Sequence, residues 1–314
     1  MTDFQAAYVK LMAQGQLEER VAEAREMLEE CRLCGRQCGV NRLESTKGAV
    51  CRTGRKALVS SFNAHFGEED PLVGDHGSGT IFFTNCNLKC QYCQNYDISQ
   101  LGEGREVDAE ELAAMMLHLQ GRGCHNVNFV SPTHVIPQIL KALLIAAQRG
   151  LRVPLVHNTG GYDSLEALRL LDGVVDIYMP DMKYADPEAG LKYSKVKKYP
   201  EVNQAAVREM HRQVGDLVLD ENGVALRGLL VRHLVLPNGL AGTREIVKFL
   251  AEEISPETYI NIMAQYRPMH KAGEYPEIDR RPSPEELQDA LDLALEAGLT
   301  RLDERRPRLA WLLR

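Results

Sequence analysis

The chain has 314 residues, of which 44% are hydrophobic and 26% charged, and its formal net charge is -7. This composition is typical of a folded globular protein and excludes a disordered or fibrous chain. An acidic balance gives no general attraction to nucleic acid or to anionic membranes, so we expect neither as a partner. Without a signal-like leader or an apolar run of membrane-spanning length, the sequence predicts a cytoplasmic protein.

The leading part of the chain combines helices with cysteines. Apolar residues at helical intervals over residues 3–30 predict two helices, divided at Gly15, that pack on the domain that follows. Four cysteines among glycines come next and have the ligand number of a tetrahedral metal site. They are Cys31, Cys34, Cys38 and Cys51. A structural zinc site and an auxiliary iron-sulfur cluster both remain open, and we favour the structural role.

A second, denser group of thiols follows a predicted strand. Residues 61–75 contain turn formers and predict a connector, in which His65 is expected to be a packed side chain rather than a metal ligand. The β-branched and aromatic run from Thr80 to Thr84 predicts a strand. Directly after it, three cysteines lie in the spacing CxxxCxxC, and they are Cys86, Cys90 and Cys93. Three thiolates without a fourth protein ligand suit an iron-sulfur cluster with one iron open, whereas structural zinc takes four ligands.

From Thr80 onward, strand-like runs alternate with helical runs, which is the pattern of a parallel α/β sheet or barrel. The predicted strands cover residues 80–84, 126–130, 155–158, 174–179, 229–236 and 259–263. The predicted helices cover residues 109–120, 135–149, 164–171, 204–214 and 243–254. Ser283, followed by Pro284 and two acidic residues, marks one more helix that runs to about Ala297. Cys124 stands apart from both thiol groups and is expected to be a small buried residue.

The CxxxCxxC motif, with Tyr92 directly before the third cysteine, resembles the cluster motif of the radical S-adenosylmethionine (SAM) superfamily. Flanking segments are similar to an uncharacterised branch related to pyruvate formate-lyase activating enzymes, from about Cys31 to Pro268. The resemblance implies a partial (β/α)6 barrel that carries a [4Fe-4S] cluster and SAM. We therefore expect an N-terminal helical and four-cysteine module over residues 1–75, the barrel over 76–268 and a C-terminal helical extension over 269–314.

Functional residues of such barrels sit at the carboxyl ends of strands. By resemblance, Tyr92 lies near the SAM adenine, Asn158 contacts the ribose, and Lys183 meets the SAM carboxylate. Two glycines after Asn158 would let the backbone approach the ligand closely. Arg232 lies inside an apolar run and needs an anionic partner, for which SAM, a substrate and a buried carboxylate are the candidates.

One segment departs from the family pattern. Where the related activating enzymes carry a Gly-Gly-Glu segment that meets the SAM amino group, this chain has Ser131-Pro132-Thr133-His134. Ser131 and Thr133 have hydroxyl groups that accept such a hydrogen bond. The alternative is that both residues cap the helix that follows.

The resemblance implies a radical SAM oxidoreductase. A one-electron reductant such as flavodoxin or ferredoxin would reduce the cluster, SAM would be cleaved to a 5′-deoxyadenosyl radical, and this radical would abstract hydrogen from a substrate. The implied substrate is a glycyl residue of a partner enzyme, and modification of a peptide or of a small metabolite is the alternative. A non-catalytic iron-sulfur electron carrier or a zinc-binding protein is the alternative of another class, but neither needs an open iron or polar strand ends.

Overall fold

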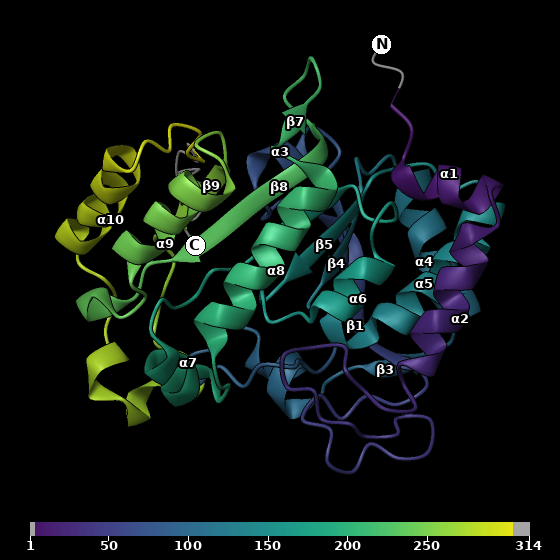
Figure 1. The fold of residues 1–314 in the computed structure, drawn as a ribbon, viewed down its shortest axis with the longest axis horizontal. Coiled ribbons are helices and arrows are strands. Elements are labelled where there is room, and N and C mark those ends of the chain that lie inside the picture. The colour runs from purple at the N-terminus through teal and green to yellow at the C-terminus, as the bar shows by residue number, and fades with distance from the viewer. Residues whose placement is uncertain (1–3, 304–314) are drawn as a thin grey trace.

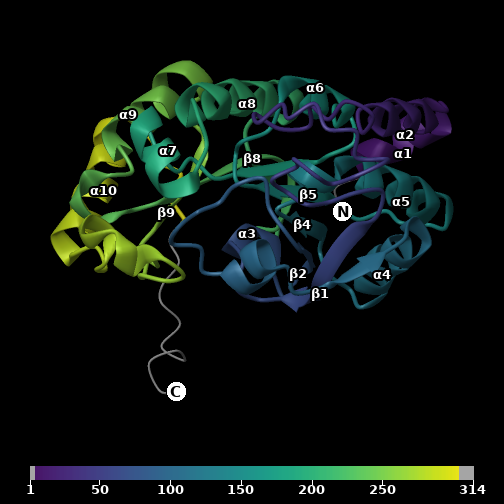
Figure 2. The same cartoon turned by 90° about the horizontal axis from the view of Figure 1, so that it is seen from below.

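A computed structural model describes residues 4–303 of the protein. In this part of the chain one sheet of nine strands has helices along its outer side (Figures 1 and 2). No helix among the described residues is long and apolar enough to cross a membrane. Residues 304–314 of the expected C-terminal extension lie outside the described residues.

Six neighbouring strands of the sheet are parallel and follow one another in chain order. They are β2 (Ser78–Phe83), β4 (Val127–Val130), β5 (Leu155–Thr159), β6 (Ile177–Pro180), β8 (Ala225–Leu234) and β9 (Tyr259–Met263). A helix lies between each consecutive pair, so the chain repeats a strand-helix unit around an open sheet. The prediction of an α/β fold built as a partial (β/α)6 barrel is confirmed.

The predicted helices appear in the predicted order, but the helix expected from residue 204 begins at Tyr199, and a helix over Pro187–Ser194 was not predicted. These helices are α4 (Ala109–Gly121), α5 (Ile136–Gln148), α6 (Leu165–Leu170), α7 (Pro187–Ser194), α8 (Tyr199–Val214), α9 (Thr243–Phe249), which continues as a π-helical turn over Leu250–Ile254, and α10 (Pro284–Glu296). Helix α10 begins at the predicted serine: Ser283 accepts from the backbone of Glu286, and the Glu286 carboxylate accepts from the backbone of Ser283. This reciprocal cap satisfies two otherwise unpaired amide groups.

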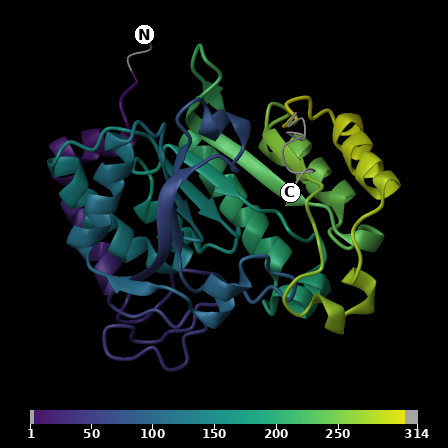
Figure 3. The same ribbon diagram turned by 180° about the vertical axis from the view of Figure 1, so that it is seen from behind.

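The sheet also contains strands that the sequence did not indicate. Strand β1 (Ala57–His65) pairs antiparallel with β2, and β3 (Arg105–Val107) pairs antiparallel with β1. The predicted connector is therefore wrong for residues 61–65. Most side chains of β1 are exposed or only half buried, because it lies toward the edge of the sheet (Figure 3). It thus lacks the alternation of apolar and polar residues that predicts a strand. A short strand β7 (Val218–Leu219) adds to β8.

Two helices lead the chain, α1 (Ala7–Ala13) and α2 (Gln16–Glu26), and Gly15 separates them with a positive φ of 73°. Leu17 and Ala24 are fully buried in the main core, as the predicted apolar face required. A third short helix, α3 (Asp70–Val73), lies on the inner side of the sheet (Figure 2). Its Leu72 packs among apolar residues near the beginnings of the strands, including Ile177 and Ala225. The opposite ends of the strands therefore face the open part of the barrel.

Candidate functional site

The cysteine loop begins where β2 ends. Thr84 donates from its backbone to Leu58 of β1, and Asn85 then turns the chain with a positive φ of 70°. Asparagine tolerates this left-handed conformation better than most residues. The Asn85 backbone donates to Ile98, and its side-chain oxygen accepts from Arg52 at 2.7 Å. These contacts hold the beginning of the loop on both sides.

The three thiols of this loop line a cavity of about 450 Å³ at the carboxyl ends of the strands. Predicted site residues from four other strand ends line the same cavity, and they are Ser131, Asn158, Lys183 and Arg232. His65 also lines it and packs edge-on against Phe82, with 5.5 Å between the ring centroids. The strand-end rule therefore brings together most of the residues that it selected.

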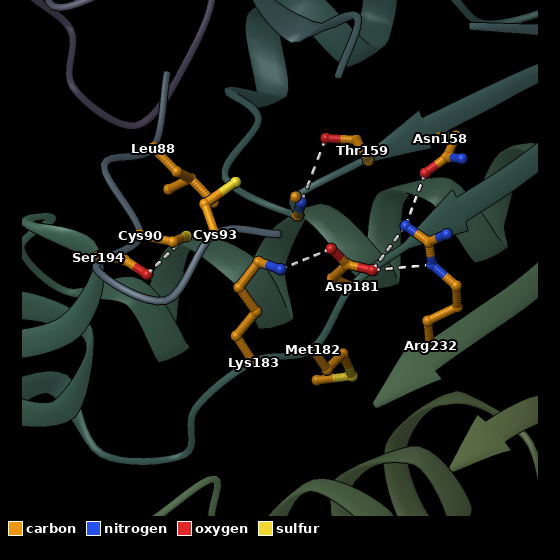
Figure 4. A network of polar contacts seen from close by, with 12 residues as sticks. Leu88, Cys90, Cys93, Asn158, Thr159, Asp181, Met182, Lys183, Ser194 and Arg232 are labelled. Carbon is orange, nitrogen blue, oxygen red and sulfur yellow. Dashed lines mark hydrogen bonds and ion pairs between the residues drawn. The ribbon is translucent and has the colours of Figure 1, made fainter. Parts of the chain in front are cut away.

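Each thiol of the cavity has a hydrogen-bonding neighbour. Cys90 Sγ lies 3.0 Å from Ser194 Oγ, and Cys93 Sγ lies 3.1 Å from Ser99 Oγ. Figure 4 marks the contact between Cys90 and Ser194. Burial raises the pKa of Cys90 to about 12. A thiol with such a pKa is protonated at neutral pH until a bound metal displaces the proton.

The donor set fits an iron-sulfur cluster. Three sulfur atoms, with hydroxyl and amide groups beside them, match the ligands and the hydrogen bonds that such clusters use. In the described part of the chain, no three cysteine, histidine, aspartate or glutamate side chains are arranged as ligands of one metal ion. A cluster assigns each thiolate to its own iron, so its ligands need not converge on a single point.

A network of charges lies beside the thiols (Figure 4). Asp181, which follows β6, accepts from Lys183 Nζ at 2.6 Å and from Arg232 at 2.8 Å. Arg232 also donates to Asn158 Oδ1 at 2.7 Å and lies 3.9 Å from Glu68. The anionic partner that Arg232 needed is thus a pair of carboxylates within the protein. Burial alone would raise the pKa of Asp181, but Arg232 and Lys183 outweigh burial and lower this pKa below its ordinary value.

The segment that replaces Gly-Gly-Glu divides between the cavity and the core. Ser131 lines the cavity and has a positive φ of 57°, a conformation that costs a non-glycine residue energy and is typical of functional sites. Thr133 is buried and hydrogen bonds to Thr159 and Asp163, so the structure does not place it at the cavity. Neither residue caps α5, whose first turn has no side-chain cap. The capping alternative is therefore wrong.

Neither His134 nor Tyr92 is among the residues that line the cavity. His134 is buried and contacts the Thr84 carbonyl through Nε2 at 3.1 Å, and burial lowers its pKa to about 3. Tyr92 is buried in a cluster of tyrosines, with its hydroxyl 2.6 Å from that of Tyr184, and is not among the residues that line the cavity. A contact between Tyr92 and adenine remains a prediction.

The glycines after Asn158 serve close contacts within the protein. A Cβ atom on Gly161, whose φ is 72°, would lie 2.3 Å from the Asp181 carbonyl oxygen. A Cβ on Gly160 would lie 2.6 Å from Leu88 of the cysteine loop. The absence of side chains therefore lets the end of β5 approach both the loop and the end of β6.

The four leading cysteines line a second, much smaller cavity of about 10 Å³. Beside it, Arg42 is only 1% exposed and donates through Nη1 to Cys31 Sγ at 3.5 Å. Its other nitrogens donate to the carbonyls of Thr53 and His134. A buried guanidinium needs acceptors for its hydrogen bonds, and two carbonyl oxygens and a cysteine sulfur supply them here.

The four-cysteine segment also directly contacts the cysteine loop that follows β2. Arg36 Nε donates to the Asn87 carbonyl at 2.6 Å, and Arg52 holds Asn85. Arg42 reaches the same region through His134, which contacts Thr84. The segments that carry the two groups of thiols are thus joined by hydrogen bonds.

Sequence reasoning missed several residues of the cavity. Glu68 and Glu69 lie within the predicted connector, where an acidic pair is usually solvated, and both are buried against the cavity. Ser99, which lines the cavity, and Ser194, which contacts Cys90 without lining the cavity, also escaped notice, because single serines carry no signal of their own. Ser194 is distant in the sequence, so only the fold brings it to the thiol.

Comparison with known proteins agrees with this geometry. Residues 80–221 match the sequence profile of the Radical SAM superfamily. An uncharacterised protein of Methanocaldococcus jannaschii is 36% identical over 293 residues, which cover 90% of this chain and 79% of the relative. The pyruvate formate-lyase-activating enzyme of Clostridium pasteurianum is 29% identical over 131 residues, or 40% of this chain and 53% of that enzyme.

Among solved structures, methylornithine synthase aligns with 96% of this chain and 82% of its own, at 14% identity and a TM-score of 0.45. The assignment rests on the sequence matches and on the cysteine loop at the end of β2. On these grounds the chain belongs to the radical SAM superfamily.

Proposed function

We propose that this protein is an oxidoreductase that cleaves SAM reductively and abstracts hydrogen from a substrate in the 450 Å³ cavity. The single observation that carries the proposal is that Cys86, Cys90 and Cys93 share this cavity with Lys183, Asn158 and Arg232. Membership of the superfamily implies a [4Fe-4S] cluster and SAM. When both are bound, they supply a 5′-deoxyadenosyl radical.

The residues of the chain bind and orient the ligands of this chemistry. Cys86, Cys90 and Cys93 would hold the cluster. Lys183, kept in place by Asp181, would meet the SAM carboxylate, and Asn158 offers a donor and an acceptor to the ribose hydroxyls. Asp181 orients the lysine through a hydrogen bond of 2.6 Å, so little conformational freedom is lost when the ligand binds.

For the substrate, we propose abstraction from a glycyl residue of a partner enzyme, with a flavodoxin or ferredoxin as the source of the electron. The similarity to a pyruvate formate-lyase-activating enzyme, with 29% identity over 131 residues, supports this choice. Modification of a peptide or a small metabolite is the alternative. The division into residues 1–75, 76–268 and 269–314 also belongs to this proposal.

The test is an anaerobic assay of SAM cleavage. The protein is reconstituted with iron and sulfide, mixed with SAM and dithionite, and assayed for 5′-deoxyadenosine. Product formation supports the proposal and directs the search to substrates. A reconstituted cluster that forms no product and whose spectrum SAM does not change would favour the non-catalytic electron carrier instead.

For the leading module, we propose that Cys31, Cys34, Cys38 and Cys51 hold a second metal, and that this metal is zinc in a structural role. Their cavity of about 10 Å³ has room for one water-sized body, which suits a single ion better than a cluster. The four sulfurs do not converge on one point as they stand. They would turn toward the ion when it binds.

We expect replacement of Cys34 with serine to remove the second metal while the iron of the cysteine loop is retained. Cys34 lies in the small cavity, and the three cluster thiols line a different one. Elemental analysis of the purified protein should show loss of zinc, with Cys124→Ser as the matched control because Cys124 lies outside both thiol groups. Loss of iron with no change in zinc would contradict this assignment.

A further inference from the structure

Two adjacent glutamates that the proposed chemistry does not use line the 450 Å³ cavity. Glu68 and Glu69 directly precede α3, the helix that packs inside the barrel. They are 7% and 3% exposed and line the same cavity as the cluster thiols. Carboxylates are almost never this buried unless a partner compensates them.

The bases in the described lining of the cavity gather at one carboxylate. This lining includes the carboxylates of Glu68, Glu69 and Asp181 and the permanently charged bases Lys183 and Arg232. Both bases are bound to Asp181, and Arg232 lies 3.9 Å from Glu68. Arg232 is near enough for the charge of Glu69 to act on it, but no ion pair within 4 Å reaches the Glu69 carboxylate in the described part of the chain.

One carboxylate oxygen of Glu69 also lacks a hydrogen-bond donor within residues 4–303. Its Oε1 accepts from the Asn261 side chain at 2.9 Å. Its Oε2 is buried and has no hydrogen-bond donor among the described residues. A charged oxygen removed from water without a donor is costly, so this atom marks the place of a missing partner.

We propose that the substrate of this enzyme carries a primary ammonium group and that Glu69 binds it. This inference rests on the proposed function, because it places the substrate in the cavity of the cluster thiols. It favours the alternative substrates, a peptide or a small metabolite that carries the ammonium group, over a glycyl residue, whose backbone amide is neutral. An ammonium group brings one positive charge and only donors, which are what the bare oxygen lacks. A guanidinium fits less well, because it pairs best with two free carboxylate oxygens and Asn261 already occupies one.

A pair of probes of equal shape tests the ammonium site. Binding of 1,5-diaminopentane and of 1,5-pentanediol to the reconstituted enzyme with SAM is measured by anaerobic calorimetry. We expect the diamine to bind roughly tenfold more tightly or better, the size expected of a hydrogen bond to a charged group. Glu69→Gln should remove this preference. Glu221→Gln removes the same charge from an exposed site and should leave the preference for the diamine unchanged.

Equal binding of the two probes to the wild-type protein would overturn the inference, whatever the variants do. Retention of the full preference in a folded Glu69→Gln protein would overturn it as well. Formation of 5′-deoxyadenosine by the wild type is measured in the same preparation without probe. If the wild type forms product but binds both probes equally, only the ammonium site fails. If it prefers the diamine but forms no product, only the proposed function fails.

Discussion

Replacement of Cys90 with alanine is expected to reduce formation of 5′-deoxyadenosine roughly 1000-fold or more, as for other groups on which a reaction depends. Cys90 is the central thiol of the loop and is 8% exposed, with Ser194 as its hydrogen-bonding neighbour. Among the described residues, three cysteines line this cavity, so no other thiol there replaces it. The variant should therefore assemble no functional cluster.

Cys124→Ala is the matched control for this prediction. Cys124 is 2% exposed, but it lies outside both thiol groups, so its loss removes a buried cysteine without touching a metal ligand. The control should retain product formation, iron content and the absorbance of the cluster. If Cys90→Ala cleaved SAM at the rate of Cys124→Ala, the assignment of Cys90 as a ligand would be wrong.

Local patterns were sufficient to predict the thiol site. Cys86, Cys90 and Cys93 lie within eight residues, so their grouping needs no knowledge of distant contacts. Asn158, Lys183 and Arg232 come from different strands, and the rule that parallel strands end at one face brought them together. The structure adds Asp181, which connects the last two through one carboxylate.

The residues that the sequence did not reveal depend on how the chain folds back. Glu69 becomes buried because α3 turns into the barrel, and nothing in its neighbourhood signals that turn. Thr133 is adjacent to a strand end, yet its hydroxyl turns to Asp163 in the core. Tyr92 has the expected position in the motif, but its ring packs edge-on against Tyr184 and Tyr266 and does not line the cavity. Side-chain direction depends on packing partners, which pattern and spacing do not specify.

Replacement of Asp181 with asparagine is expected to lower the free energy of unfolding by about 3–5 kcal/mol at pH 7, the usual loss when one partner of a buried ion pair is removed. The side chains of Asp181, Lys183 and Arg232 are only 13%, 15% and 18% exposed. Without the carboxylate, the two cations face each other in a confined space. Urea unfolding of the metal-free protein measures the loss.

The surface ion pair of Asp172 with Arg212 provides the matched control. Those side chains are 40% and 56% exposed, so Asp172→Asn should cost no more than about 1 kcal/mol. Equal losses for Asp172→Asn and Asp181→Asn would mean that the buried network contributes no more than an exposed pair.

The pH dependence separates charge from packing at Asp181. Arg232 and Lys183 hold the pKa of Asp181 below its ordinary value. Asp181 therefore contributes its full stabilisation above the pKa of an aspartate in the unfolded chain, which is about 4. The contribution is lost as the pH falls through the lower pKa of the folded protein. The difference between wild type and Asp181→Asn should therefore be constant at neutral pH and shrink as the pH falls below about 4. A difference that does not change with pH would assign the loss to hydrogen-bond geometry, since the aspartate of the wild type titrates in this range and the asparagine of the variant does not.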